Sequence, residues 1–105
     1  MSQEEAFITS DQKGLVLSFS PEASVLFGYS PEEIIGRKRL STFHKRGALR
    51  DLLPRLMHEA QEQGLFQEEV VMRRKNGTEF RADLTVRPLF EEGVLTGYSV
   101  LAHEV

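Results

Sequence analysis

Two stretches of the chain alternate between apolar and polar residues, the pattern of a β-strand with one buried face. They span residues 66–72 and 80–86, and the sequence Asn76-Gly77 lies between them. An Asn-Gly pair is typical of tight hairpin turns, so we expect the two strands to pair antiparallel. A further strand is expected at 94–102, after a turn within residues 88–93.

Two shorter apolar runs near the N-terminus also indicate strands. They cover residues 6–9 and 15–19, and the segment 10–14 separates them. That segment contains Asp11, whose side chain can bond the nearby backbone, and ends in Gly14, which tolerates a positive φ. The region therefore predicts a second hairpin.

Two short helices are predicted where Ser-Pro begins a segment and glycine ends it, at residues 20–28 and 30–36. The serine hydroxyl accepts from the free amides of a first turn, proline suits the first helical position, and glycine adopts the left-handed conformation that ends a helix. In the second segment, Ser30 and Glu33 also have the spacing of a capping box.

A longer helix is predicted from apolar residues that recur three and four positions apart between Leu49 and Ala60, with Gly64 at its end. Pro54 falls inside this pattern, and proline is tolerated without a kink only in the first turn of a helix. We therefore expect the helix to begin close to Pro54, with Asp51 as its N-cap.

The order of these elements is two strands, then helices, then three strands. Helices grouped between antiparallel strands are typical of an α+β domain with the helices on one face of the sheet. The 105 residues are 40% apolar, which is enough for one modest core, and no linker-like tract interrupts them. We expect a single domain spanning residues 1–105.

Composition narrows the classes of function. The chain contains no cysteine, which excludes disulfides, thiolate nucleophiles and cysteine-bound metals. A net charge of −3 argues against a nucleic-acid-binding protein that neutralises many phosphates. No apolar run approaches the roughly 18 residues of a membrane span, and the first residues do not resemble a signal peptide. We expect a cytoplasmic chain, without membrane insertion, whose partner is a protein or a small molecule.

The residues that carry chemistry are scattered along the chain. His44, His58 and His103 are isolated, without the spacing of metal ligands, so no metal site is predicted. We expect His58 and His103 at the surface, and His44 either there, partly buried, or in contact with a pocket. Adjacent acids such as Glu68-Glu69 point apart in a strand and cannot share a proton. The pattern predicts no catalytic set, and a small α+β enzyme that depends on His44 is the least favoured alternative.

Several motifs together are similar to a known family. The chain contains SDQKGLVL, FSPEASVLFGYS, PEEIIGR, RRKNGTEF and GYSVLAHEV in this order. In this order and spacing they resemble a PAS domain, the sensor and interaction module of bacterial and eukaryotic signalling proteins, over nearly the whole chain. The resemblance implies a five-stranded antiparallel sheet in the order 2-1-5-4-3, with helices wrapping one face and a pocket between helices and sheet.

The resemblance and the apolar faces predict the lining of that pocket, and the alternative for each residue is plain core. Such a lining suits a small apolar or lipid-like molecule, with Ser99 as a polar group that orients it. The ligand-pocket candidates are Phe27, Ile35, Phe43, His44, Leu53, Met57, Met72, Leu84 and Ser99.

The resemblance also implies a structural ion pair. In the family, a glutamate of the PEEIIG box commonly pairs with a lysine of the hairpin turn, which here joins Glu33 to Lys75. The alternative is two solvated surface charges. An exposed pair contributes little to stability, so its value would lie in tying a helix to the sheet.

Two cofactors of the family each require a particular residue, so the sequence shows whether that residue is present. Its flavin-binding light sensors form an adduct with a reactive cysteine, and this chain has none, so that photochemistry is excluded. Haem-binding members carry a histidine on the long helix at the position of Leu53, so haem is not expected. The identity of a ligand stays open.

The last strand predicts an interface. Residues of both parities between 95 and 102 are largely apolar, which indicates a strand covered on both sides. One side faces the helices, and the other is expected to form an exposed apolar patch with the first strand. In PAS proteins a preceding amphipathic segment or a second copy covers that surface, and only five residues precede Ala6, so we expect a homodimer. The interface candidates are Ala6, Ile8, Tyr98 and Val100.

These features predict a non-enzymatic sensory and dimerisation module, excised from a longer bacterial signalling protein such as a two-component kinase, a cyclase or a chemoreceptor. Occupancy of the pocket, or the state of the interface, would shift a two-state equilibrium in an attached effector domain. The alternative is a scaffold that binds no ligand, only pairs chains, and has a packed core without a cavity.

Overall fold

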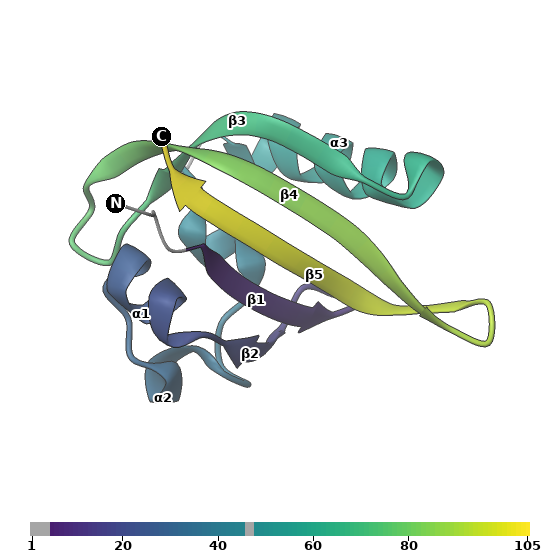
Figure 1. The fold of residues 1–105 in the computed structure, drawn as a ribbon, viewed down its shortest axis with the longest axis horizontal. Helices are drawn as coiled ribbons and strands as arrows, with labels where there is room; N and C mark the ends of the chain where they lie inside the picture. The colour runs from purple at the N-terminus through teal and green to yellow at the C-terminus, as the bar shows by residue number, and fades with distance from the viewer. Residues whose placement is uncertain (1–4, 46–47) are drawn as a thin grey trace.

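The fold is a five-stranded antiparallel sheet with its helices on one face (Figure 1). The computed structural model describes residues 5–45 and 48–105. The strand order is β2-β1-β5-β4-β3, which confirms the predicted α+β class and order. The strands are β1 (Ala6–Asp11), β2 (Val16–Phe19), β3 (Phe66–Arg73), β4 (Glu79–Glu91) and β5 (Val94–Glu104). The helices are α1 (Pro21–Phe27), α2 (Pro31–Ile34), the 3-10 helix η1 (Leu40–Phe43) and α3 (Ala48–Gln63).

The hairpin of β4 and β5 is longer than the sequence predicts. Pro88 lies within β4 opposite Tyr98, and the turn is reduced to Glu92-Gly93. Pro88 is tolerated there because pairing between β3 and β4 ends at Val86, which leaves this part of β4 as an edge. Glu92 and Gly93 both have positive φ, 51° and 80°, as a two-residue hairpin turn of type I′ requires. The end of the hairpin projects beyond the rest of the sheet (Figure 1).

The short helices α1 and α2 start where the sequence predicts. The hydroxyl of Ser20 accepts from the backbone N–H of Ala23 at 3.1 Å and from that of Phe7 at 2.9 Å, so this cap also ties α1 to β1. At α2, the backbone N–H of Ser30 donates to the carboxylate of Glu33 at 2.8 Å. The caps form between residues close in sequence, and in the folded protein the cap of α1 also bonds β1.

The long helix, α3, starts earlier in the chain than the sequence predicts. It begins at Ala48, so Pro54 lies in its interior and Asp51 is not its N-cap. The apolar face of the helix packs Leu56 and Ala60 into the core. Packing of such a face contributes more to helix stability than local propensity, which explains how the helix continues through a proline.

Two polar contacts attach α3 to the sheet. Arg55 pairs with Glu68 of β3 at 2.7 Å, and the amide of Gln61 donates to the hydroxyl of Tyr98 on β5 at 2.8 Å. These contacts hold the helix across the inner face of three adjacent strands, β3, β4 and β5. Among the residues with described placement, no helix is both long and apolar enough to cross a membrane.

The inner face of the sheet carries the four residues that the sequence predicts at an interface. Ala6, Ile8, Tyr98 and Val100 are all at most 4% exposed and belong to the hydrophobic core. The assignment of faces was therefore wrong: these residues face the helices, and Ser99 lies on the outer face instead, opposite Thr9 of β1. Because β5 is the central strand, both of its parities are largely apolar, and only its register with neighbouring strands distinguishes them.

Candidate functional site: an apolar cavity beneath helix α3

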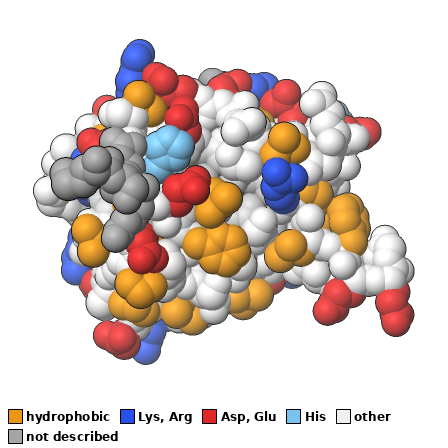
Figure 2. Space-filling model, viewed as in Figure 1, with side chains coloured by type: hydrophobic (Ala, Val, Ile, Leu, Met, Phe, Trp, Pro, Cys, Tyr) orange, Lys and Arg blue, Asp and Glu red, His pale blue; other side chains and the backbone are white. Residues whose placement is uncertain are grey.

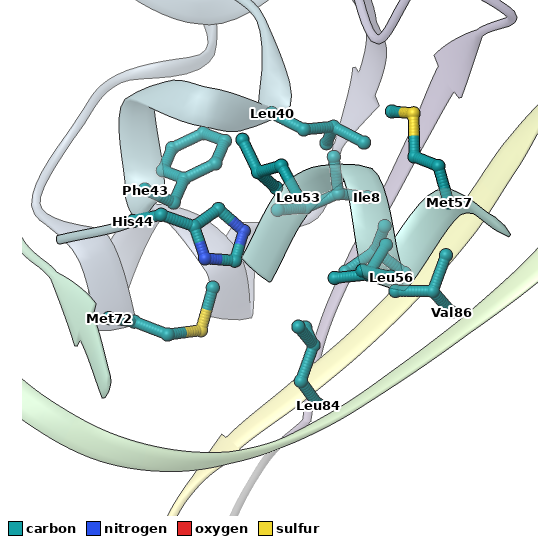
Figure 3. A pocket seen from close by; sticks show the side chains of 11 residues that line it. Ile8, Leu40, Phe43, His44, Leu53, Leu56, Met57, Met72, Leu84 and Val86 are labelled. Atoms are coloured by element: carbon teal, nitrogen blue, oxygen red, sulfur yellow. The ribbon is translucent and has the colours of Figure 1, made fainter. Parts of the chain in front are cut away.

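A small, partly enclosed cavity lies between α3, η1 and the inner face of the sheet (Figure 3). Its free volume is about 10 Å³, room for at most one water molecule. Among its described lining residues, His44 is the only one with a polar side chain. The lining residues are Ile8, Leu40, Phe43, His44, Leu53, Leu56, Met57, Met72, Leu84, Val86 and Val100.

The structure brings most of the predicted pocket residues together. Six of the candidates line this cavity: Phe43, His44, Leu53, Met57, Met72 and Leu84. Sequence reasoning missed Ile8 and Val100 because it assigned them to the outer face of the sheet. Leu56 was visible in the apolar spacing of α3, but nothing in that spacing distinguishes a cavity wall from packed core.

Three candidates lie elsewhere. Phe27 is fully buried in an aromatic cluster, with its ring centroid 4.7 Å from that of Phe43 and 5.9 Å from that of Phe80. Ile35 is 40% exposed, because it follows the last residue of α2 and its backbone is already extended. Ser99 points away from the cavity on the outer sheet face.

Backbone contacts on both sides place His44 at the cavity. It follows the last residue of η1, and its backbone N–H donates to the carbonyl of Ser41 at 3.2 Å. It also forms an isolated antiparallel bridge with Met72 of β3. Figure 3 shows the imidazole between the side chains of Met72 and Leu53. The backbone contacts thus fix the position of His44, and apolar neighbours surround its ring.

The imidazole of His44 is an unusual group to find in such a place. The residue is 4% exposed, and its Nδ1 has no hydrogen-bond partner among the side chains that the structure describes, those of residues 5–45 and 52–105. Burial lowers the pKa of His44 from 6.5 to about 4, because an apolar environment disfavours the charged form. The side chain is therefore neutral at physiological pH, with an unused polar atom.

Methionines form two of the cavity walls. Met57 on α3 and Met72 on β3 lie on different sides of it (Figure 3). Methionine has an unbranched, flexible side chain that adapts to irregular space. The cavity is thus bounded in part by side chains that can move without a change in the backbone.

The cofactors found in some PAS domains do not fit this cavity. A flavin or a haem needs far more room than about 10 Å³. In addition, Leu53 on α3, the position of the haem-ligating histidine in the family, is one of the apolar lining residues. The geometry therefore favours a ligand much smaller than either group.

The implied ion pair between Glu33 and Lys75 is present in the structure. The hydrogen bond from Lys75 is the main reason that the pKa of Glu33 falls from 4.5 to about 2, and the backbone N–H of Ser30 lowers it further. The backbone N–H of Lys75 also donates to the carbonyl of Phe27 at 2.8 Å. These contacts fasten the α1–α2 region to the β3–β4 turn, at a distance from the cavity.

The other histidines offer no second site. His58 is exposed on α3, and His103 lies on β5 with its Nε2 3.0 Å from the carboxylate of Asp83. Within the part of the chain that the structure describes, no group of three or more His, Asp or Glu residues is arranged to hold a metal ion. The cavity is thus the best-defined candidate site.

Comparisons with known proteins agree with this architecture. A family model described as "PAS domain" matches residues 4–105. The PAS domain of a protein from Colwellia psychrerythraea superposes with a TM-score of 0.92 at 20% identity, covering 96% of this chain and 86% of that one. A PAS domain from a two-component sensor histidine kinase has a TM-score of 0.78 at 17% identity, covering 96% and 85%.

A fungal LOV domain photoreceptor is also similar, with a TM-score of 0.79 at 22% identity, covering 100% of this chain and 76% of that one. Identities at this level show a shared fold and do not transfer a ligand. The family model, by contrast, spans almost the whole sequence. Together with the strand order and the helices on one sheet face, it shows that the chain belongs to the PAS domain family.

Proposed function

We propose that this chain is a non-enzymatic sensory module that binds a small, mostly apolar molecule beneath α3 and relays its presence to an attached effector domain. The observation that carries the proposal is the partly enclosed cavity with one polar side chain, His44, in an otherwise apolar described lining. With about 10 Å³ free, the core is close to the packed one that the scaffold alternative predicts, so a ligand has to displace side chains. Concave apolar sites with few polar groups are typical of small-molecule recognition. The similarity to a PAS domain from a two-component sensor histidine kinase supports a two-component protein as the parent, which we propose to be bacterial and cytoplasmic.

We expect the effect of ligand binding to pass from α3 to the end of β5 and the start of β1. The cavity is walled by Leu53 and Met57 of α3 on one side and by Val100 of β5 on the other. Strand β5 ends at Glu104, beside the start of β1, where Ala6 pairs with Ala102. A ligand that separates α3 from β5 would act next to both ends of the described chain. It can shift a two-state equilibrium only if it binds the two states with different affinity.

Native mass spectrometry of freshly purified protein tests this function. We expect species that carry extra non-covalent mass, which disappears when the same sample is measured under denaturing conditions. The denatured sample is the control for covalent modification. Protein that carries only the mass of the bare chain, and that also takes up no molecule from a panel of small apolar compounds, would refute the sensory reading and favour the ligand-free scaffold.

A second candidate function is dimerisation through the outer sheet face. Phe7 on β1 is 42% exposed and pairs across the strands with Leu101 of β5. Figure 2 shows hydrophobic side chains gathered near the middle of this face. We propose that a second copy of the chain covers Phe7 and Leu101. This pair takes the place of the buried residues that the sequence predicts at the interface.

A further inference from the structure

We propose that the cavity selects a neutral molecule with a single hydroxyl group on a small apolar body, and that Nδ1 of His44 is the atom that hydrogen-bonds this hydroxyl. This inference rests on the proposed small-molecule function and adds to it the chemical class of the ligand. The carrying observation is the buried Nδ1, which has no partner among the side chains that the structure describes, on a residue, His44, that lines the cavity.

A buried polar atom without a hydrogen bond is unfavourable, and most such atoms in proteins are satisfied. Replacing the imidazole by an apolar side chain would remove that penalty, yet the chain places a histidine here. The other lining side chains that the structure describes are all apolar and offer it no partner. A bound molecule with one polar group would satisfy Nδ1 and bury the rest of its surface against those side chains.

The charge of the imidazole determines which polar group fits. Since burial lowers the pKa of His44 to about 4, the ring is neutral near pH 7 and provides no positive charge for a carboxylate or a phosphate. No lysine or arginine is among the described lining residues. An anion would therefore lose its hydration without gaining an ion pair, so the ligand is neutral.

The tautomer of the imidazole points to a hydroxyl. In a neutral ring, Nδ1 is either an acceptor or an N–H donor, depending on the tautomer. A hydroxyl can donate to Nδ1 in the first case and accept from it in the second, whereas a ketone only accepts. A hydroxyl is thus the simplest group that pairs with His44 in both forms.

The residues that line the cavity limit the size of the bound molecule. About 10 Å³ is free, so a ligand larger than water has to displace side chains. Met57 and Met72 can yield because they are flexible, while Phe43 is held in the aromatic cluster with Phe27. This favours a compact apolar body over a long chain or a multi-ring cofactor.

The test compares phenol, toluene and benzoate, which share a ring and differ in one substituent. Each is titrated at pH 7 into the wild type, into His44→Leu, and into His58→Leu as a matched control on an exposed histidine, with binding followed by amide chemical shifts. We expect the ratio of phenol affinity to toluene affinity to fall by about tenfold in His44→Leu and to stay unchanged in His58→Leu. Benzoate should bind the wild type more weakly than phenol.

The outcomes separate this inference from the proposed function. If phenol and toluene bind, but with the same ratio in the wild type and in His44→Leu, the role of His44 is wrong and the cavity remains a ligand site. Tighter binding of benzoate than of phenol would overturn the neutral class. If neither the wild type nor Leu53→Ala, whose shorter side chain enlarges the cavity, binds any of the three probes, both proposals fail.

A second readout covers the case in which His44→Leu does not fold. The ¹⁵N chemical shift of Nδ1 in the wild type reports its protonation and hydrogen bonding directly. We expect this shift to change on addition of phenol and to stay constant on addition of toluene. A shift that moves equally with both compounds would reflect a general change in packing and would overturn the assignment of Nδ1.

Discussion

At the scale of single residues, His44 combines high burial with an unused polar atom. The other described residues of the cavity lining are apolar, so none of them places a carboxylate or a second base beside it. Desolvation alone lowers its pKa from 6.5 to about 4. A residue with this environment reduces stability, which is common where a site is kept for binding.

The stability of the fold should therefore depend on pH through His44. The pKa of His44 is lower in the folded state than in the unfolded chain, so the unfolded chain takes up the proton first as the pH falls. The free energy of unfolding is therefore highest above pH 6.5, and this part of the stability is lost as the pH falls toward 4. The complete shift corresponds to about 3 kcal/mol.

Urea unfolding at several pH values between 4 and 8 measures this effect. We expect His44→Leu to be more stable than the wild type at pH 7 by about 1–3 kcal/mol, because it removes an unsatisfied buried group. The advantage should grow as the pH falls, while His58→Leu follows the wild type. Parallel curves for His44→Leu and the wild type would show that His44 titrates normally.

At the scale of elements, the contact between β1 and β5 depends on a glycine. Gly97 lies opposite Asp11, and a Cβ atom at Gly97 would stand 1.9 Å from the backbone oxygen of Ser10. Backbone cannot yield as a flexible side chain can, so these strands would have to separate. The central sheet pairing therefore constrains this position independently of any turn conformation.

Gly97→Ala should consequently destabilise the domain by about 3 kcal/mol or more. Gly93→Ala is the matched control: its φ is 80°, but no atom lies within 4 Å of the added Cβ, so only the left-handed conformation is penalised, by about 1–2 kcal/mol. Thermal unfolding of both variants separates the steric effect from the conformational one. Equal losses in the two proteins would mean that β1 adapts to the extra atom.

At the scale of the whole molecule, the helices cover one face of the sheet and leave the other open (Figure 1). The open face is mixed: Phe7 and Leu101 form an apolar pair, while Ser99 and Arg87 form a polar one beside it. Its occupant is proposed to be a second copy, since the fold itself leaves this face without helices.

Phe7→Glu should shift the chain toward the monomer in sedimentation equilibrium, because it places a charge in the centre of the proposed interface. Val25→Glu is the control, since Val25 is 84% exposed on α1 and does not belong to the sheet. The control should retain the oligomeric state of the wild type. A wild type that is monomeric at all concentrations, or a Phe7→Glu protein that remains a dimer, would contradict the proposal.

The sequence by itself determined the features that depend on neighbours along the chain. The Ser-Pro starts of α1 and α2 and the Asn76-Gly77 turn were predictable because capping and turn chemistry involve residues only a few positions apart. Alternation located β3 and β4, and the motifs together indicated the PAS family and thus the strand order. Most of the pocket candidates followed from these elements.

Only the tertiary structure decided which face of β5 is buried, because both parities of this central strand are apolar and its register with β1 and β4 distinguishes them. That register moved Tyr98 and Val100 into the core and Ser99 to the outside. Packing of its apolar face against the core likewise explains why α3 continues past Pro54. The burial of His44 depends on its bridge to Met72, a contact between residues distant in sequence, and no local pattern specifies such a contact.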